Sequence, residues 1–171
     1  MKKNRISALC TLCSFICFSV VLLIQFVQKR EIQKTAYQNI PVFSLPDMNG
    51  QQVSEKFLQK HTPTLFLFFD PGCDLCQEEF QQINQNREQL KRGQIVFFSV
   101  EPAETIRDFL DKLHFSPTSN MFFLIDTNEI LMNTMEIKGP PTSIIYDKDG
   151  KQIKRFDGPV KIETLIKYLS D

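Results

Sequence analysis

The sequence predicts an α/β fold with a central mixed sheet flanked by helices. Residues 64–69 and 94–100 are apolar runs with the length of buried strands, and residues 74–91 between them are polar and free of Gly and Pro. This order favours two parallel strands joined by a right-handed crossover helix. Further along, Asp149-Gly150 separates two alternating segments, which indicates an antiparallel hairpin.

The chain on either side of this centre supplies the other elements. Residues 41–45 alternate like a half-buried strand, and residues 51–54 can return beside them after the turn signal Asn49-Gly50. We therefore expect an N-terminal β-hairpin extension of the sheet domain. The remaining expected elements are helices over 103–115, 127–134 and 159–169, and strands over 121–126, 143–146 and 152–156.

The first 38 residues differ in character from the rest. Residues 6–27 contain no charged side chain over 22 positions, which is enough for a helix to span a bilayer. They follow a basic tail, residues 1–5, and precede a polar tether, residues 28–38. Because the apolar run is longer than the about 7 to 15 residues of a signal-peptide core and no small-residue cleavage site closes it, we favour an uncleaved transmembrane anchor over a cleaved signal peptide.

The charge distribution predicts where the domain over residues 39–171 lies. The basic tail favours a cytoplasmic N-terminus, although three basic residues also follow the apolar run. We expect a single-pass protein of the inner (cytoplasmic) membrane whose domain faces the periplasm or the cell exterior. All 20 acidic residues follow residue 5, against 17 of the 20 basic ones, so no nucleic-acid-binding surface is indicated.

Two cysteines at the first strand-to-helix turn predict a redox-active dithiol. Cys73 falls at the N-terminus of the expected helix, where the helix dipole favours a thiolate, whereas the carboxylate of Asp74 opposes it. Cys76 lies one turn deeper and is the natural resolving thiol. A purely structural disulfide is less favoured, because closing so short a loop removes little chain entropy.

These features together resemble the thioredoxin fold, and more narrowly the membrane-anchored TlpA/ResA-like branch of the redoxins. The resemblance covers about residues 39–171. It rests on the Pro41 to Gly50 opening, Cys73-Asp74-Leu75-Cys76, Pro141-Thr142 before an apolar strand, and the hairpin from Asp147 to Lys151. It implies a cis Pro141 packed beside the cysteines and an acidic functional residue, Glu79, three positions after Cys76.

The sequence departs from the family pattern at three positions near the dithiol. Gly72 replaces the usual Trp before the first cysteine, and Leu67 stands where many thioredoxins have a buried Asp. Pro140 precedes the expected cis-proline and has no N–H, although family members commonly pair a partner's backbone with that residue. These departures leave the substrate undetermined.

The resemblance implies a thiol:disulfide oxidoreductase with Cys73, Cys76, Glu79 and Pro141 in its catalytic site. Its partners would be protein thiol or disulfide substrates and a membrane-embedded or periplasmic electron donor. We expect no cofactor and no resident metal, because structural zinc takes four ligands and the domain adds only His61 and His114 to the two thiols.

Two other functions use the same cysteines. The first is a tethered thioredoxin-fold binding module or copper carrier, for which a histidine after the third core strand would be expected; none follows His114. The second is a peroxiredoxin-like peroxidase, which shares the 41–50 opening but has Pro and Thr at fixed spacing before its cysteine. Asp70-Pro71-Gly72 supplies no Thr there.

Overall fold

The computed structural model describes residues 18–25 and 38–170. The chain divides into two compact units, Met1–Ala36 and Tyr37–Asp171, and within the first unit the described residues are helical. In the described part of the chain, no helix is both long and apolar enough to cross a membrane.

Several predicted N-terminal segments lie largely outside the described residues. The predicted tail over 1–5 lies wholly outside them. Of the predicted anchor over 6–27 only residues 18–25 are described, and of the tether over 28–38 only residue 38. The boundaries of these segments therefore stay predictions.

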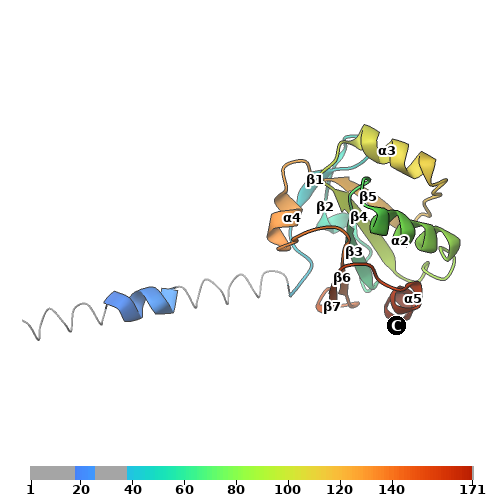
Figure 1. Ribbon diagram of the computed structural model, residues 1–171. Coiled ribbons are helices and arrows are strands. Elements are labelled where there is room, and N and C mark those ends of the chain that lie inside the picture. The colour runs from blue at the N-terminus through green and yellow to red at the C-terminus, as the bar shows by residue number, and fades with distance from the viewer. Residues whose placement is uncertain (1–17, 26–37, 171) are drawn as a thin grey trace, which may run out of the picture. The chain divides into compact units, whose positions relative to one another are not determined.

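A five-stranded mixed sheet forms the centre of the second unit (Figure 1). Its strands are β3 (Thr64–Phe68), β4 (Gln94–Ser99), β5 (Met121–Ile125), β6 (Thr142–Tyr146) and β7 (Gln152–Asp157). The spatial order is β5-β4-β3-β6-β7, with β3, β4 and β5 parallel and β6 antiparallel to both β3 and β7. The mixed sheet confirms the sequence-based prediction.

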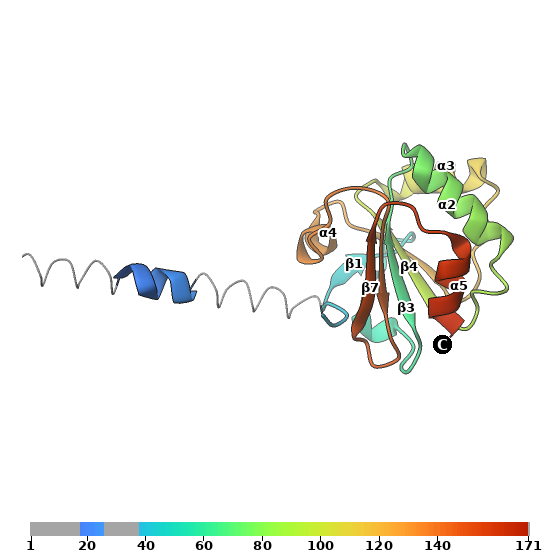
Figure 2. The ribbon, with the colours of Figure 1, turned by 60° about the horizontal axis from the view of Figure 1, so that its bottom comes forward.

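The two faces of the sheet are covered by different elements (Figure 2). One face carries α2 (Asp74–Gln85), α3 (Ala103–Lys112) and α5 (Ile162–Ser170). The other carries the hairpin of β1 (Ser44–Pro46) and β2 (Gln52–Ser54), the short helix η1 (Glu55–Phe57) and α4 (Ile130–Thr134). Since the crossovers β3–α2–β4 and β4–α3–β5 run in the same direction and are right-handed, α2 and α3 share a face.

Strand β3 is apolar at nearly every position because both of its faces are buried. Leu65 and Leu67 point into the core beneath α2 and α5, whereas Phe66 and Phe68 point into the core beneath the hairpin and α4. Phe80 of α2 anchors the first core, where its ring lies 4.8 Å from the ring centroids of both Phe69 and Phe97. The cysteine pair between β3 and α2 is therefore held by a buried strand and a well-packed helix.

The two hairpin loops are built in the same way. Asp47 Oδ1 accepts the N–H groups of Asn49 and Gln51 at 2.8 and 2.9 Å, and Gly50 has a φ of 80°. In the second loop Asp147 accepts two backbone N–H groups in the same pattern, and Gly150 has a φ of 76°. A glycine in the left-handed region closing a three-residue loop is a common hairpin solution, and both predicted hairpins are confirmed.

All four predicted helices are shorter than expected, and side chains explain two of the ends. The helix predicted over 74–91 ends at Gln85, because the Asn86 side chain donates to the carbonyl of Gln82 and the chain continues as a series of turns. Asp126 sets the start of α4 by accepting the N–H groups of Ile130 and Met132, each at 2.8 Å. Local polar side chains, which helical periodicity does not register, decide these ends.

Gly93 permits close contact between the start of β4 and α5. A Cβ at this position would lie 2.8 Å from Leu169 Cδ2 and 3.1 Å from the carbonyl oxygen of Pro63. We expect Gly93→Ala to lower the free energy of unfolding by about 1 to 3 kcal/mol through overpacking. Urea denaturation checks this against Gly139→Ala, where a Cβ would meet nothing within 4 Å. Equal stabilities of the two variants would contradict the prediction.

Candidate active site

Cys73 caps the N-terminus of α2 with its thiol. The residue is extended, with φ of −87° and ψ of 116°, and its Sγ accepts the backbone N–H of Cys76 at 3.4 Å. The preceding turn is held by Asp70, whose carbonyl accepts the N–H of Cys73 at 3.0 Å and whose Oδ1 accepts that of Gly72 at 2.6 Å. Sulfur thus takes the place of the usual capping oxygen, and the helix N-terminus faces it with a hydrogen-bond donor.

The two thiols are free and differ in access. Cys73 is partly exposed, whereas Cys76 is fully buried in the core beneath α2. Burial raises the pKa of the Cys76 thiol well above its ordinary value, and Cys73 and Glu79 raise it further. Cys73 is therefore the sulfur that a partner can reach, and Cys76 needs a proton acceptor before it can react as a thiolate.

Glu79 is a buried acid one helical turn beyond Cys76. Its side chain is only 2% exposed; Oε1 accepts the Ser143 hydroxyl at 3.5 Å, while Oε2 has no hydrogen-bond partner. Burial raises the pKa of this carboxyl to about 7, although Ser143 and the backbone N–H of Val160 act to lower it. Glu79 therefore exchanges a proton near neutral pH beside a thiol that must lose one.

Pro141 follows the residue whose carbonyl lies beside Cys73. The Pro140–Pro141 peptide bond is cis, which confirms the cis Pro141 that the resemblance implied. The carbonyl oxygen of Pro140 lies 3.9 Å from Cys73 Sγ, and that of Pro141 accepts the N–H of Gly158 at 2.9 Å. The loop leading into β6 thus forms one wall beside the nucleophile, and its position is fixed by the end of β7.

The fold brings Cys73, Cys76 and Glu79 together and places Pro140, the neighbour of Pro141, beside Cys73. It adds Ser143, which sequence reasoning missed. Ser143 lies opposite Leu67 in the β3–β6 register and is fully buried. Its hydroxyl is thus the polar group that β6 contributes to Glu79. The neighbouring position on β3, Leu67, is the one where many thioredoxins have a buried Asp. A serine within an otherwise apolar strand was the available signal.

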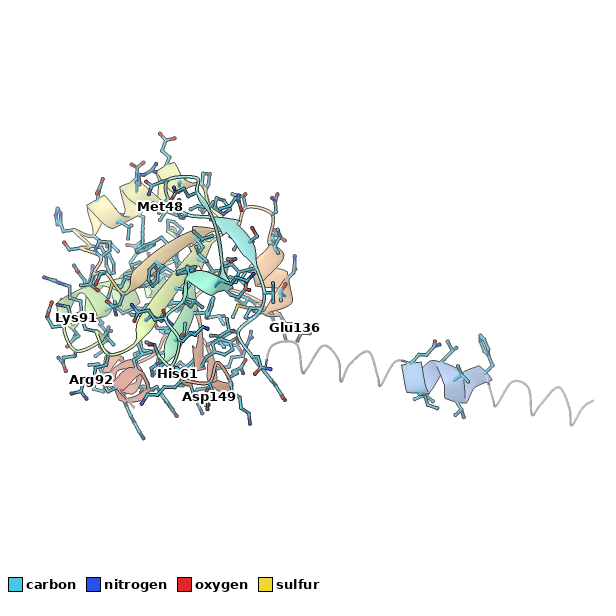
Figure 3. All side chains as sticks on the ribbon, turned by 180° about the vertical axis from the view of Figure 1, so that it is seen from behind. Met48, His61, Lys91, Arg92, Glu136 and Asp149 are labelled. Atoms are coloured by element: carbon cyan, nitrogen blue, oxygen red, sulfur yellow. The ribbon has the colours of Figure 1, made fainter. Side chains whose placement is uncertain are left out.

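The two histidines of the domain lie apart from this site. His61 and His114 are both exposed, and Figure 3 shows His61 near Asp149 at the end of the domain opposite Met48. A hollow of about 340 Å³ lined by His61 and Asp149 includes neither cysteine. Among the described residues, no three His, Cys, Asp or Glu side chains are grouped as metal ligands would be.

Comparison with known proteins places the chain in a family. A profile described as a thioredoxin-like domain matches residues 50–171. Thiol-disulfide oxidoreductase ResA of Bacillus cereus is 24% identical, over 99% of this chain and 97% of the relative.

Solved structures show the same fold. A putative thiol:disulfide interchange protein DsbE from Chlorobium tepidum has a TM-score of 0.65 and 21% identity, covering 78% of this chain and 96% of that one. Peroxidoxin BcpB from Mycobacterium tuberculosis has the same TM-score and 16% identity, covering 77% and 93%, so the likeness of fold does not separate these activities. Because the profile spans well over half of the chain, the protein belongs to the thioredoxin-like domain family, and its recognition as a thioredoxin-like thiol:disulfide oxidoreductase is confirmed.

Proposed function

We propose that the protein exchanges disulfides with other proteins through Cys73 and Cys76. The observation that carries this proposal is the asymmetry of the pair: a partly exposed Cys73 whose Sγ accepts an N–H of the α2 N-terminus, backed by a buried Cys76. An exposed thiol with a helix N-terminus behind it is suited to attack, and a buried neighbour is suited to resolve.

Bonds and electrons balance between the two cysteines and one substrate disulfide. The Cys73 thiolate attacks one sulfur of a substrate disulfide, forming a mixed disulfide, and the other substrate sulfur leaves as a thiolate that takes a proton. The Cys76 thiolate then attacks Cys73 Sγ, forming the Cys73–Cys76 disulfide and releasing the second substrate sulfur as a thiol. Two electrons pass to the substrate, and the reverse sequence oxidises a substrate dithiol.

Glu79 and Pro141 have separate roles in this scheme. Glu79 accepts the proton of Cys76 when that thiol becomes the nucleophile, which its position and its pKa of about 7 both favour. Pro141 shapes the wall beside Cys73 and keeps the pair from open contact with solvent.

We also propose that residues 6–27 anchor the chain in the inner membrane, with the domain in the periplasm or outside the cell. The uncharged 22-residue run supports this proposal. There the dithiol would meet protein substrates and receive electrons from a membrane-embedded or periplasmic donor. Alkaline extraction of membranes from cells making the full chain checks the anchor, and release of the chain into the soluble fraction would contradict it.

A redox titration tests the central proposal against the metal-carrier alternative. The full chain would carry Cys10, Cys13 and Cys17 as serine, so that only the site pair responds to thiol reagents. In glutathione or dithiothreitol buffers we expect a reversible two-electron couple, with the ratio of dithiol to disulfide changing tenfold per about 30 mV. Cys76→Ser in the same background is the control and loses the intramolecular couple. Tight stoichiometric binding of copper or zinc without such a couple would favour the carrier.

A further inference from the structure

The segment from Gly139 to Pro141 is the natural place for a polypeptide to dock. It leads directly into β6, and the carbonyl of its middle residue lies 3.9 Å from Cys73 Sγ. A substrate chain that brings a sulfur to Cys73 passes along this segment. An extended chain beside the end of a strand would ordinarily bind by adding main-chain hydrogen bonds, as an extra strand does.

This segment offers no backbone donor at Pro140 and Pro141, the two residues beside Cys73. The carbonyl of Gly139 already accepts the Thr142 hydroxyl at 2.7 Å, and that of Pro141 accepts the N–H of Gly158 at 2.9 Å. The remaining carbonyl, on Pro140, faces the thiol of Cys73. Proline at the edge of a sheet disfavours pairing with a further strand, and the adjacent prolines have the same effect at this end of β6.

The surface beside the nucleophile is instead apolar. Leu75, two residues from Cys73, is 45% exposed. Pro140, whose carbonyl lies beside the thiol, is exposed, and Pro71, two residues before Cys73, is half-buried. These side chains offer van der Waals contact that is insensitive to the register of a substrate backbone.

We propose that Pro140 determines specificity by removing the backbone donor that strand-like docking needs, so that this protein selects disulfides flanked by apolar side chains. The inference rests on the proposed function, since it concerns how a protein disulfide reaches Cys73. Leu75 and Pro140 hold the flanking side chains, and the substrate backbone contributes little to binding.

Peptide disulfides with an altered backbone test this on the full chain. The substrates are a disulfide-linked peptide with leucine beside each cysteine, and the same peptide with the amides flanking one cysteine replaced by esters, which weakens the acceptor and removes the donor. For the wild-type protein we expect kcat/KM to change by less than about twofold between them, because no main-chain pair is lost. Hydroxyethyl disulfide, which has no peptide backbone, serves as the reference substrate.

A matched variant reverses the expectation. Pro140→Ala restores an N–H beside Cys73, so kcat/KM for the amide peptide should rise by about 2- to 10-fold, the worth of one net hydrogen bond. The ester peptide should lose that gain, so the ratio of the amide rate to the ester rate, about 1 for the wild-type protein, should rise to about 2 to 10 in Pro140→Ala. Pro117→Ala, at an exposed proline before the opposite end of the sheet, is the control for proline removal and should change neither rate.

The outcomes separate this inference from the proposed function. If the wild-type protein reduces hydroxyethyl disulfide and the amide peptide but loses about 5-fold or more with the ester peptide, strand-like docking is in use and the inference is wrong. If leucine-flanked peptides react no better than serine-flanked ones, the apolar selection is wrong. If no disulfide reacts at all, the proposed function itself fails. The first two measurements need only the wild-type protein, so their interpretation does not depend on whether a variant folds.

Discussion

Replacing Cys73 by serine is expected to abolish the reduction of protein disulfides, while replacing Cys76 by serine is expected to trap the substrate on Cys73. Cys73 is the accessible sulfur, and a serine hydroxyl does not replace a thiolate in disulfide exchange, so the loss should be about 10³-fold or more. Without Cys76 the first attack still occurs, but no buried thiol resolves the mixed disulfide.

Insulin reduction by the full chain with Cys10, Cys13 and Cys17 changed to serine measures the first effect, and that parent chain is the matched control. Non-reducing electrophoresis after mixing with a single-disulfide protein measures the second. Cys76→Ser should show a mixed-disulfide band that dithiothreitol removes, and Cys73→Ser should show none. Parental activity in Cys73→Ser would exclude Cys73 as the nucleophile and end the proposed mechanism.

Most of the fold is predictable because its signals are local and strong. The continuous apolar runs of β3 and β4 follow from burial on both faces. The Asp149-Gly150 turn predicts the hairpin between β6 and β7. The order of these elements, with two cysteines at the first crossover, was sufficient to identify the thioredoxin-like architecture. These features depend on residues close together in the chain, which is why a single sequence reveals them.

The parts that escaped prediction depend on single side chains or on contacts between distant segments. The end of α2 is set by the amide of Asn86, whereas the polar pattern continues past it. Ser143 reaches Glu79 across 64 positions of sequence, because β6 pairs with β3 and α2 covers that pair. The contact of Pro140 with Cys73 likewise exists only once β6 has joined the sheet.

The sequence predicts which residues form the candidate site, but it does not predict their protonation states. Its place three residues after Cys76 makes Glu79 the acid that the family resemblance implies to be functional. Its pKa depends on how much water the fold removes and on which donors the fold brings in, namely Ser143 and the N–H of Val160. Sequence spacing says nothing about either quantity, so the titration of Glu79 became visible only in the folded structure.

Glu79→Gln is expected to stabilise the protein at alkaline pH and to leave its stability nearly unchanged in acid. The folded-state pKa of Glu79, about 7, lies above the ordinary 4.5, so folding favours the neutral carboxyl. The wild-type protein should therefore lose stability as the pH rises from about 4.5 to 7 and then level off. The loss corresponds to at most about 3 kcal/mol, at about 1.36 kcal/mol for each pH unit between the two values.

The amide that this substitution introduces does not ionise, so the variant should escape this loss. Urea denaturation of reduced protein at several pH values from about 4 to 8.5, which brackets both pKa values, measures the difference. Glu78→Gln, which changes an exposed side chain on the same helix, is the matched control and should follow the wild-type profile. A Glu79→Gln profile parallel to wild type would mean that Glu79 is not held neutral by burial.

The same substitution should slow resolution by Cys76. In the proposed mechanism the Glu79 carboxylate, which is ionised above a pH of about 7, is the base that accepts the Cys76 proton, and an amide cannot take that proton. Glu79→Gln should thus raise stability at alkaline pH and lower the rate of resolution. A purely structural acid would not produce this trade-off.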